Sequence, residues 1–153
     1  MPHVRTQIRD AVAALLATTA TAGDNVLVGR TRPLGVEHPP TLMVYSTPAV
    51  SGGQENASVM GLSTPRRLSR VMMLSVVGHV QEATPCDDTL DQLAAEVEEA
   101  LGGDIKLGGL VKDFVLASTV SQVDAVGDRH VGAIRLVFSV TYHTKENAPQ
   151  TAV

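Results

Sequence analysis

The chain has 153 residues, a hydrophobic fraction of 44% and a formal net charge of −4 at pH 7. This length predicts one domain with a real core, and the charge gives no support to nucleic-acid binding driven by bulk charge. The single cysteine, Cys86, excludes an internal disulfide. The longest apolar runs are far too short to span a bilayer, and the N-terminus has no apolar signal-peptide segment. We therefore expect a soluble protein that is not exported through a cleaved signal peptide.

The core must be built from aliphatic side chains, because aromatic residues make up only 3% of the chain and tryptophan is absent. Aliphatic residues bury less area per side chain, so such a core gains less hydrophobic free energy from each residue. Self-association would be one way to bury more surface.

The chain opens with a predicted amphipathic helix, in which apolar residues recur at helical spacing: Val4, Ile8, Val12, Leu15 and Leu16. Two short strands are predicted next, over residues 25–29 and 41–47. The connection between them contains three prolines, which lack a backbone donor and cannot join a strand ladder.

Residues 48–65 have little sign of regular structure and are rich in glycine, serine and other polar residues. A loop of this length inside a small domain is usually functional or disordered. We therefore predict a flexible arm within the domain.

A long strand is predicted over residues 68–81. Alternation places five apolar residues on one of its faces: Leu68, Met72, Leu74, Val76 and Val80. The opposite face is half apolar, so we expect a second helix or a neighbouring subunit to cover it.

A second helix is predicted from Thr84-Pro85-Cys86-Asp87, which resembles a capping box with proline at the first helical position. Its buried stripe is expected to comprise Leu90, Leu93, Ala94, Val97 and Leu101. Gly102 and Gly103 should end this helix.

Residues 111–123 and 131–144 are predicted to form an antiparallel hairpin. Residues 145–153 are polar and contain a proline, so we expect a disordered tail after a domain spanning residues 1–144. The order of elements predicts the α+β class, with a single mixed or antiparallel sheet, two helices packed on one face, and a long mobile loop.

The search for chemistry finds no catalytic, cofactor or metal motif. The histidines, His3, His38, His79, His130 and His143, contain no pair at metal-ligand spacing. Cys86 stands at a predicted helix N-terminus, which could lower its pKa, but it lacks a partner motif. We therefore predict no enzyme activity, no cofactor and no metal.

Arg66, Arg67 and Arg70 form the one basic cluster of the sequence. They either guard a strand edge against unwanted pairing or bind a partner. That partner would be a carboxylate of a neighbouring subunit or the phosphates of passing DNA.

Three segments, in this order, resemble the tail-terminator proteins of long-tailed bacteriophages, the lambda-like minor tail family. Residues 5–15 (RTQIRDAVAAL) are similar to the opening helix of that family. Residues 40–47 (PTLMVYST) are similar to its strand after a proline-containing loop. Residues 132–143 (GAIRLVFSVTYH) are similar to its closing strand, which typically ends in a similar Thr-Tyr. The resemblance covers nearly the whole chain.

The resemblance implies a structural virion protein made in the cytoplasm of the bacterial host. It would form a hexameric ring that caps the tail tube, stops tube polymerisation and provides the surface on which the head docks. Genomic DNA would pass through the lumen without sequence-specific binding, and no membrane is involved. Our candidate partner or lumen contacts are Arg66, Arg67 and Arg70 with the arm residues Gly52, Gly53, Gln54, Glu55, Asn56 and Met60.

Three alternatives stay open on the sequence. The first is a head-closure, neck-connector or tail-completion protein, since such proteins share this layout. The second is a small oligomeric enzyme, which would need a pocket converging on His79, Cys86 or His143. The third is a ligand-binding module, which a large apolar pocket would support.

Overall fold

The fold is taken from a computed structural model that describes residues 1–29, 40–46 and 55–153. Its helices are α1 (Val4–Leu16) and α2 (Asp87–Gly102), with a short 3-10 helix, η1 (Leu107–Gly109). Its strands are β1 (Val26–Val28), β2 (Thr41–Ser46), β3 (Asn56–Met60), β4 (Arg67–Glu82), β5 (Asp113–Val126), β6 (Arg129–Lys145) and β7 (Ala148–Ala152). None of the described helices is long and apolar enough to cross a membrane.

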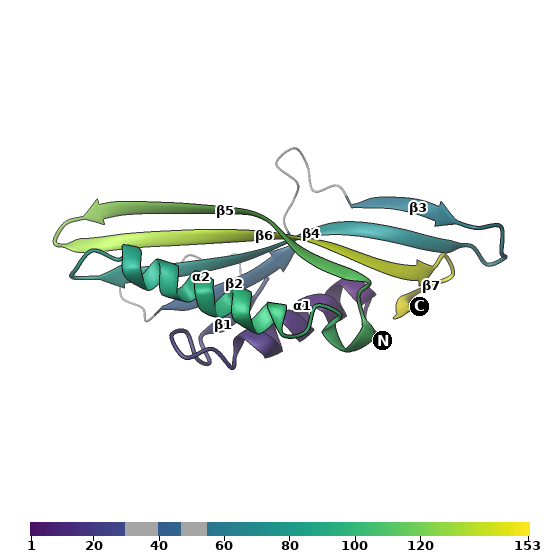
Figure 1. Cartoon of the computed structure of the whole chain (residues 1–153), viewed down its shortest axis with the longest axis horizontal. Helices are drawn as coiled ribbons and strands as arrows, with labels where there is room; N and C mark the ends of the chain where they lie inside the picture. The colour runs from purple at the N-terminus through teal and green to yellow at the C-terminus, as the bar shows by residue number, and fades with distance from the viewer. Residues whose placement is uncertain (30–39, 47–54) are drawn as a thin grey trace.

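The strands form one long, curled sheet, and both helices lie on the same face of it (Figure 1). The strand order is β1-β2-β4-β6-β5, while β3 pairs with β4 and β7 pairs with β6 at the other end of the sheet. The pairing of β1 with β2 is parallel, and the other pairings are antiparallel. This confirms the predicted α+β fold with a mixed sheet and two helices on one face.

The helices bury the residues that their periodicity indicates. In α2 the buried residues are the five predicted ones, Leu90, Leu93, Ala94, Val97 and Leu101. In α1 they are Val4, Ile8, Val12 and Leu16, whereas Leu15 is only partly buried and packs against the edge of the core. The α2 stripe packs on β4 and β6, whereas α1 packs beside α2 over β1 and β2, so one aliphatic core lies between the helices and the sheet.

Strand β6 alternates strictly between buried and partly exposed residues, from Gly132 to Thr144. The predicted inward set, Ile134, Leu136, Phe138, Val140 and Tyr142, is buried. Strand β4 differs, because Ser75 and Val77 on its outer face are buried as well. No described helix lies over this outer face, so the predicted cover by a second helix is wrong.

The prediction of a disordered tail over residues 145–153 is wrong. Strand β6 continues to Lys145, and β7 turns back to pair with it. The Gln7 side-chain amide of α1 donates to the carbonyl oxygen of Gln150 at 2.8 Å, and Ala152 packs against the core. The polar composition of this segment hides the strand, because an edge strand of five residues is held by backbone hydrogen bonds rather than by apolar side chains.

The predicted flexible arm over residues 48–65 is also corrected in part. Residues 56–60 form β3, which pairs with β4 from Asn56 opposite Val71 to Met60 opposite Arg67. All five residues of β3 are exposed. Because neither face of β3 is buried, its sequence has no apolar alternation from which a strand could be predicted. Residues 47–54 of the arm lie outside the described residues.

The predicted capping box is not formed. Helix α2 begins at Asp87, its N-cap residue is Cys86, and no side chain caps the helix. Thr84 and Pro85 therefore precede the helix. Two acidic residues in the first turn, Asp87 and Asp88, still place negative charge where the helix dipole favours it.

The N-terminal end of helix α2 lies very close to β6 at Gly132. A Cβ atom at this position would lie 2.7 Å from the Cys86 sulfur and 2.7 Å from Cδ1 of Leu90. The start of the helix can reach the sheet here only because glycine has no side chain. Gly132 thus sets the height of the α2 N-terminus above the sheet.

We expect Gly132→Ala to lower the free energy of unfolding by about 1–3 kcal/mol, because the added methyl group must displace the helix. Chemical denaturation at one fixed protein concentration measures the effect. The matched control is Gly102→Ala at the end of α2, where a Cβ atom would meet nothing within 4 Å. The control should be neutral or slightly stabilising. Equal stability of Gly132→Ala and the wild type would contradict this description of the contact.

Candidate assembly interface

The three arginines of the predicted basic cluster have different environments. Arg66 forms an exposed ion pair with Glu146, with 2.8 Å between Nε and Oε2. Arg70 points to the helix side of the sheet, where its Nη1 lies 3.6 Å from Oε1 of Glu55. Arg67 lies on the opposite, outer face, directly across from Lys145 of β6. The structure therefore does not bring the three guanidinium groups together into one patch.

Glu55 is the centre of a polar cluster at the base of the β3–β4 hairpin. Its carboxylate pairs with Arg5 of α1 at 3.2 Å and with Arg70 of β4 at 3.6 Å. It also accepts a hydrogen bond from the hydroxyl of Tyr142 in β6. The Glu55 side chain is only 13% exposed, so a single carboxylate joins three elements in a partly dehydrated site.

The electrostatics of this cluster favour a neutral phenol and a neutral imidazole beside the carboxylate. Burial, followed by the Glu55 carboxylate, raises the pKa of Tyr142 well above its usual value. Burial, followed by the charges of Arg5 and Arg70, lowers the pKa of His3. Arg70 is held further by a 3.1 Å hydrogen bond from its Nε to the buried hydroxyl of Thr144. The cluster anchors the hairpin to the body of the domain.

A separate basic pair lies on the outer face near the end of the sheet. Arg67 and Lys145 are opposite each other in the antiparallel β4–β6 pairing, and both are exposed. His143, two residues before Lys145, has a lowered pKa because of burial and then the charges of Lys112 and Arg67. Like charges placed directly opposite each other in a sheet are destabilising unless a counter-charge is supplied.

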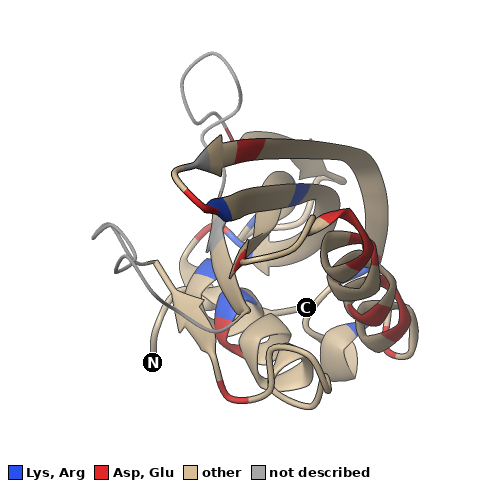
Figure 2. Cartoon of the chain, turned by 90° about the vertical axis from the view of Figure 1, so that its left-hand side faces the viewer, with Lys and Arg blue, Asp and Glu red and all other residues tan. Residues whose placement is uncertain are grey.

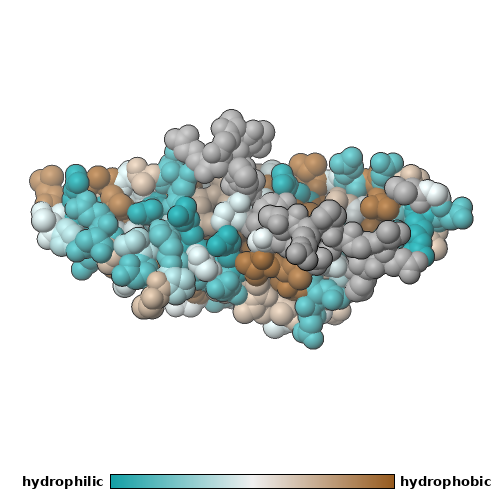
Figure 3. Space-filling view, turned by 180° about the vertical axis from the view of Figure 1, so that it is seen from behind, coloured by the Kyte–Doolittle hydropathy of each residue, from teal (hydrophilic) through white to brown (hydrophobic). Residues whose placement is uncertain are grey.

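The tip of the β3–β4 hairpin carries apolar side chains in water. Gly61 turns the chain with a φ of 70°, and Leu62 beside it is fully exposed. Val59 and Met60 of β3 are exposed as well. The hairpin extends past the ends of both helices in Figure 1. Figure 3 shows apolar atoms at this end of the molecule, on the left in that view.

Among the described strands, β5 pairs with β6 alone, so it is an edge strand. After Phe114, its described side chains are exposed on both faces of the strand, and four of them are large and apolar: Val115, Leu116, Val120 and Val123. A long, uncovered edge with exposed apolar residues is a ready template for pairing with another chain. Natural proteins usually protect such an edge, so this one is a strong candidate for an interface.

A groove of about 160 Å³ lies between β5 and the C-terminal half of α2. It is lined by Glu98, Leu101, Gly102, Ile105, Phe114, Leu116 and Phe138. Figure 2 shows acidic residues along α2, which holds six carboxylates and no lysine or arginine. The Glu96 carboxylate accepts hydrogen bonds from the backbone amide and the hydroxyl of Thr21, whereas Glu98 and Glu99 are exposed. The groove is therefore apolar at its floor and acidic at its rim.

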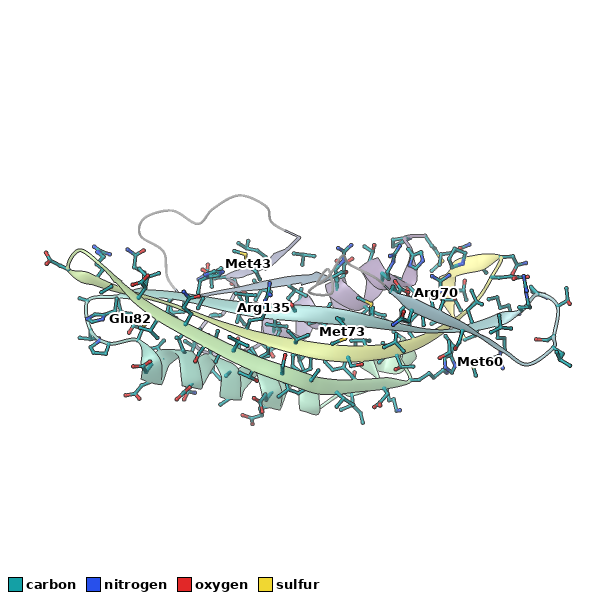
Figure 4. All side chains as sticks on the ribbon, turned by 90° about the horizontal axis from the view of Figure 1, so that it is seen from above. Met43, Met60, Arg70, Met73, Glu82 and Arg135 are labelled. Carbon is teal, nitrogen blue, oxygen red and sulfur yellow. The ribbon has the colours of Figure 1, made fainter. Side chains whose placement is uncertain are left out.

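The outer face of the sheet holds a second, open hollow of about 330 Å³. Its lining residues are Val77, His79, Val120, Gln122, Ala133 and Arg135. In Figure 4, Met43, Met73 and Arg135 come from β2, β4 and β6, and the pairing pattern places all three on this face. The hollow is broad and its polar groups do not converge on one point.

The residues proposed for an enzyme site are not brought together. Cys86 is buried on the helix side, and burial raises the pKa of its thiol, so the expectation of a lowered pKa is wrong. His79 lies on the outer face, and His143 lies ten residues further along the paired strands, opposite Ser69. Within the described part of the chain, no group of three or more metal-ligating side chains is found.

Of the residues predicted as contacts, Gly52, Gly53 and Gln54 lie outside the described residues. Asn56 and Met60 lie on the exposed strand β3, and Glu55 forms ion pairs within its own chain. Sequence reasoning missed three features: Leu62, Lys145 and the free edge of β5. Extending the alternation of β6 by one residue would have found Lys145. The edge position of β5 could not be found, because strand order is a property of the whole sheet.

No protein-family model matches this chain, and no curated protein matches it. Among solved structures, a chain from the virion of a native gene transfer agent (GTA) particle is 17% identical, with a TM-score of 0.45. That match covers 93% of this chain and 92% of the other. A second solved chain is 18% identical with a TM-score of 0.42, and the match covers 90% of this chain and 92% of that one. Both TM-scores lie below 0.5, and neither likeness assigns the chain to a family.

We expect Glu55→Gln to lower the free energy of unfolding by about 1–3 kcal/mol, because two arginines lose their partly buried counter-charge. Chemical denaturation followed by circular dichroism measures the loss. Glu146→Gln is the matched control, since its pair with Arg66 is exposed and should contribute less than about 1 kcal/mol. Equal losses of unfolding free energy in the two variants would contradict the anchoring role of Glu55.

The raised pKa of Tyr142 predicts a loss of stability in alkali. The unfolded phenol ionises near its usual pKa of about 10, whereas the folded phenol keeps its proton to higher pH. The stabilisation is therefore complete below pH of about 10 and declines as the pH rises above it. Unfolding free energies measured at pH 8 and pH 11 should show this decline. Tyr142→Phe should be less stable at pH 8 but show a smaller decline.

Proposed function

We propose that this chain is a structural virion protein of a long-tailed phage or phage-like particle. Within that class, we propose a tail terminator that caps the tail tube as a ring. The observation that carries the proposal is the free edge of β5, which leaves apolar side chains exposed in a chain that is otherwise well packed on its helix side. A surface of this kind fits a subunit of an assembly.

The shape of the domain supports a ring rather than a closed two-fold dimer. Its exposed apolar features differ from each other: an edge strand beside α2, and a hairpin tip beyond the ends of the helices (Figure 1). A contact between two different surfaces is heterologous, and it generates a ring when the rotation closes. The similarity of three segments to tail terminators supports the same assembly, with tube protein below and a head–neck protein above.

The described residues favour assembly over catalysis or ligand binding. The groove beside α2 is small, the outer hollow is open, and His79, Cys86 and His143 are on separate parts of the sheet. We expect DNA in the lumen to meet the ring without sequence-specific binding, because contacts to phosphates carry no sequence information. The formal net charge of −4 gives little electrostatic attraction for those phosphates.

The proposal predicts a defined oligomer in solution or on tail tubes. Light scattering across a concentration range should give the mass of a hexamer, or of a monomer that becomes a hexamer when polymerised tail tubes are added. The capped tubes should stop growing when more tube protein is supplied. A chain that stays monomeric or dimeric and leaves tube growth unchanged would contradict the proposal. A ring that binds the head connector but never the tube would favour the head-closure role.

A further inference from the structure

The β3–β4 hairpin has the features of an element that inserts into a binding groove of a partner. Its tip holds Leu62, which is fully exposed, and Val59, which is 54% exposed. Burying such exposed apolar side chains stabilises a contact by roughly 25 cal/mol for each Å² of apolar surface that is removed from water. Within one copy, the hairpin points away from the helices, and no other described element covers its tip (Figure 1).

The charges along this hairpin are unbalanced on one face only. Arg66 and Arg70 have carboxylate partners in their own chain, Glu146 and Glu55. Arg67 and Lys145, on the outer face, form no ion pair with any described residue. This pair therefore presents two positive charges side by side, where an external carboxylate would relieve their repulsion.

Helix α2 presents the opposite arrangement. Glu98 lies on the rim of the groove between α2 and β5, and Asp91 lies two helical turns before it on the same face of the helix. Both are exposed. The groove itself is floored by apolar residues, including Leu101, Leu116 and Phe138. It matches in size and chemistry an aliphatic side chain that is followed by basic residues.

We propose that the groove between α2 and β5 binds the β3–β4 hairpin of a second copy of this chain. Leu62 of one copy enters the groove, and Arg67 and Lys145 face Glu98 and Asp91 of its neighbour. The charge complementarity of the two surfaces selects a second copy as the occupant. The inference rests on the proposed ring and identifies the surfaces that would close it.

The two surfaces belong to different parts of the same molecule. A chain cannot place its own hairpin in its own groove, because the tip points beyond the helix ends (Figure 1). Each copy therefore donates one hairpin and accepts another, as a heterologous contact requires. The exposed backbone edge of β5 borders the groove and remains available to the incoming strand.

Charge reversal tests the contact directly. The hairpin variant is Arg67→Glu with Lys145→Glu, and the groove variant is Asp91→Lys with Glu98→Lys. Each variant alone should weaken association at least tenfold in sedimentation or light scattering, because like charges then face each other. Mixed in equal amounts, the two variants should regain the wild-type mass, because hairpin and groove are again complementary around an alternating ring. Such a rescue also shows that both variants are folded.

The neighbouring residue provides the matched control. Glu99→Lys changes the charge by the same amount as Glu98→Lys alone, one position along α2, but Glu99 lines a different groove together with Thr18 and Thr19. This variant should keep the wild-type mass. Leu62→Ser should weaken association as the charge reversals do, whereas Val28→Ser, at an exposed valine of β1, should not.

The outcomes separate this inference from the proposed function. A ring that forms on tubes with all these variants unchanged overturns the hairpin-in-groove contact and leaves the terminator proposal standing. A wild-type chain that never oligomerises, with or without tubes, overturns both. In a further outcome, the hairpin variant keeps the oligomer mass of the wild type and loses affinity for duplex DNA. That result would show that Arg67 and Lys145 bind DNA phosphates, and it would overturn the inference.

Discussion

The long antiparallel pairing of β4 with β6 determines the shape of this protein. All 16 residues of β4 pair with β6, from Arg67 opposite Lys145 to Glu82 opposite His130. A strand of this length spans about 53 Å at 3.3 Å per residue. Helix α2 also has 16 residues but spans only about 24 Å at 1.5 Å per residue. Helices of ordinary length therefore cannot cover such a sheet, and part of it must remain open to solvent or to a partner.

The stabilising interactions change along the sheet for the same reason. Beneath the helices, an aliphatic core holds the strands, and Gly132 permits the close approach of α2. Beyond that core, the hairpin depends on the Glu55 carboxylate, which ties it to α1 and β6 through Arg5 and Tyr142. A charged anchor is effective at this position, because ion pairs and charge-assisted hydrogen bonds are stronger where the carboxylate is only 13% exposed.

The apolar residues left over at the sheet ends and along β5 then have a consistent explanation. A chain with 3% aromatic residues has a modest core, and its exposed valines and leucines are concentrated on an edge strand and a hairpin tip. Acidic residues on α2 and the basic pair of Arg67 and Lys145 on the outer face have opposite charges, as the proposed contact between copies requires. An exposed apolar edge and complementary charges are the features that the proposed ring subunit needs.

The sequence by itself determined the two helices, their buried stripes and the inward face of β6, because apolar residues recur with a period of about 3.6 in helices and 2 in strands. It did not determine β3 and β7, whose residues are held by backbone pairing and carry no apolar pattern. Nor did it determine the candidate interface. Arg67 and Lys145 are 78 positions apart, and the edge position of β5 follows from strand order. Only the tertiary structure decided these, because strand pairing joins residues that are distant in the chain and leaves β5 without a second neighbour among the described strands.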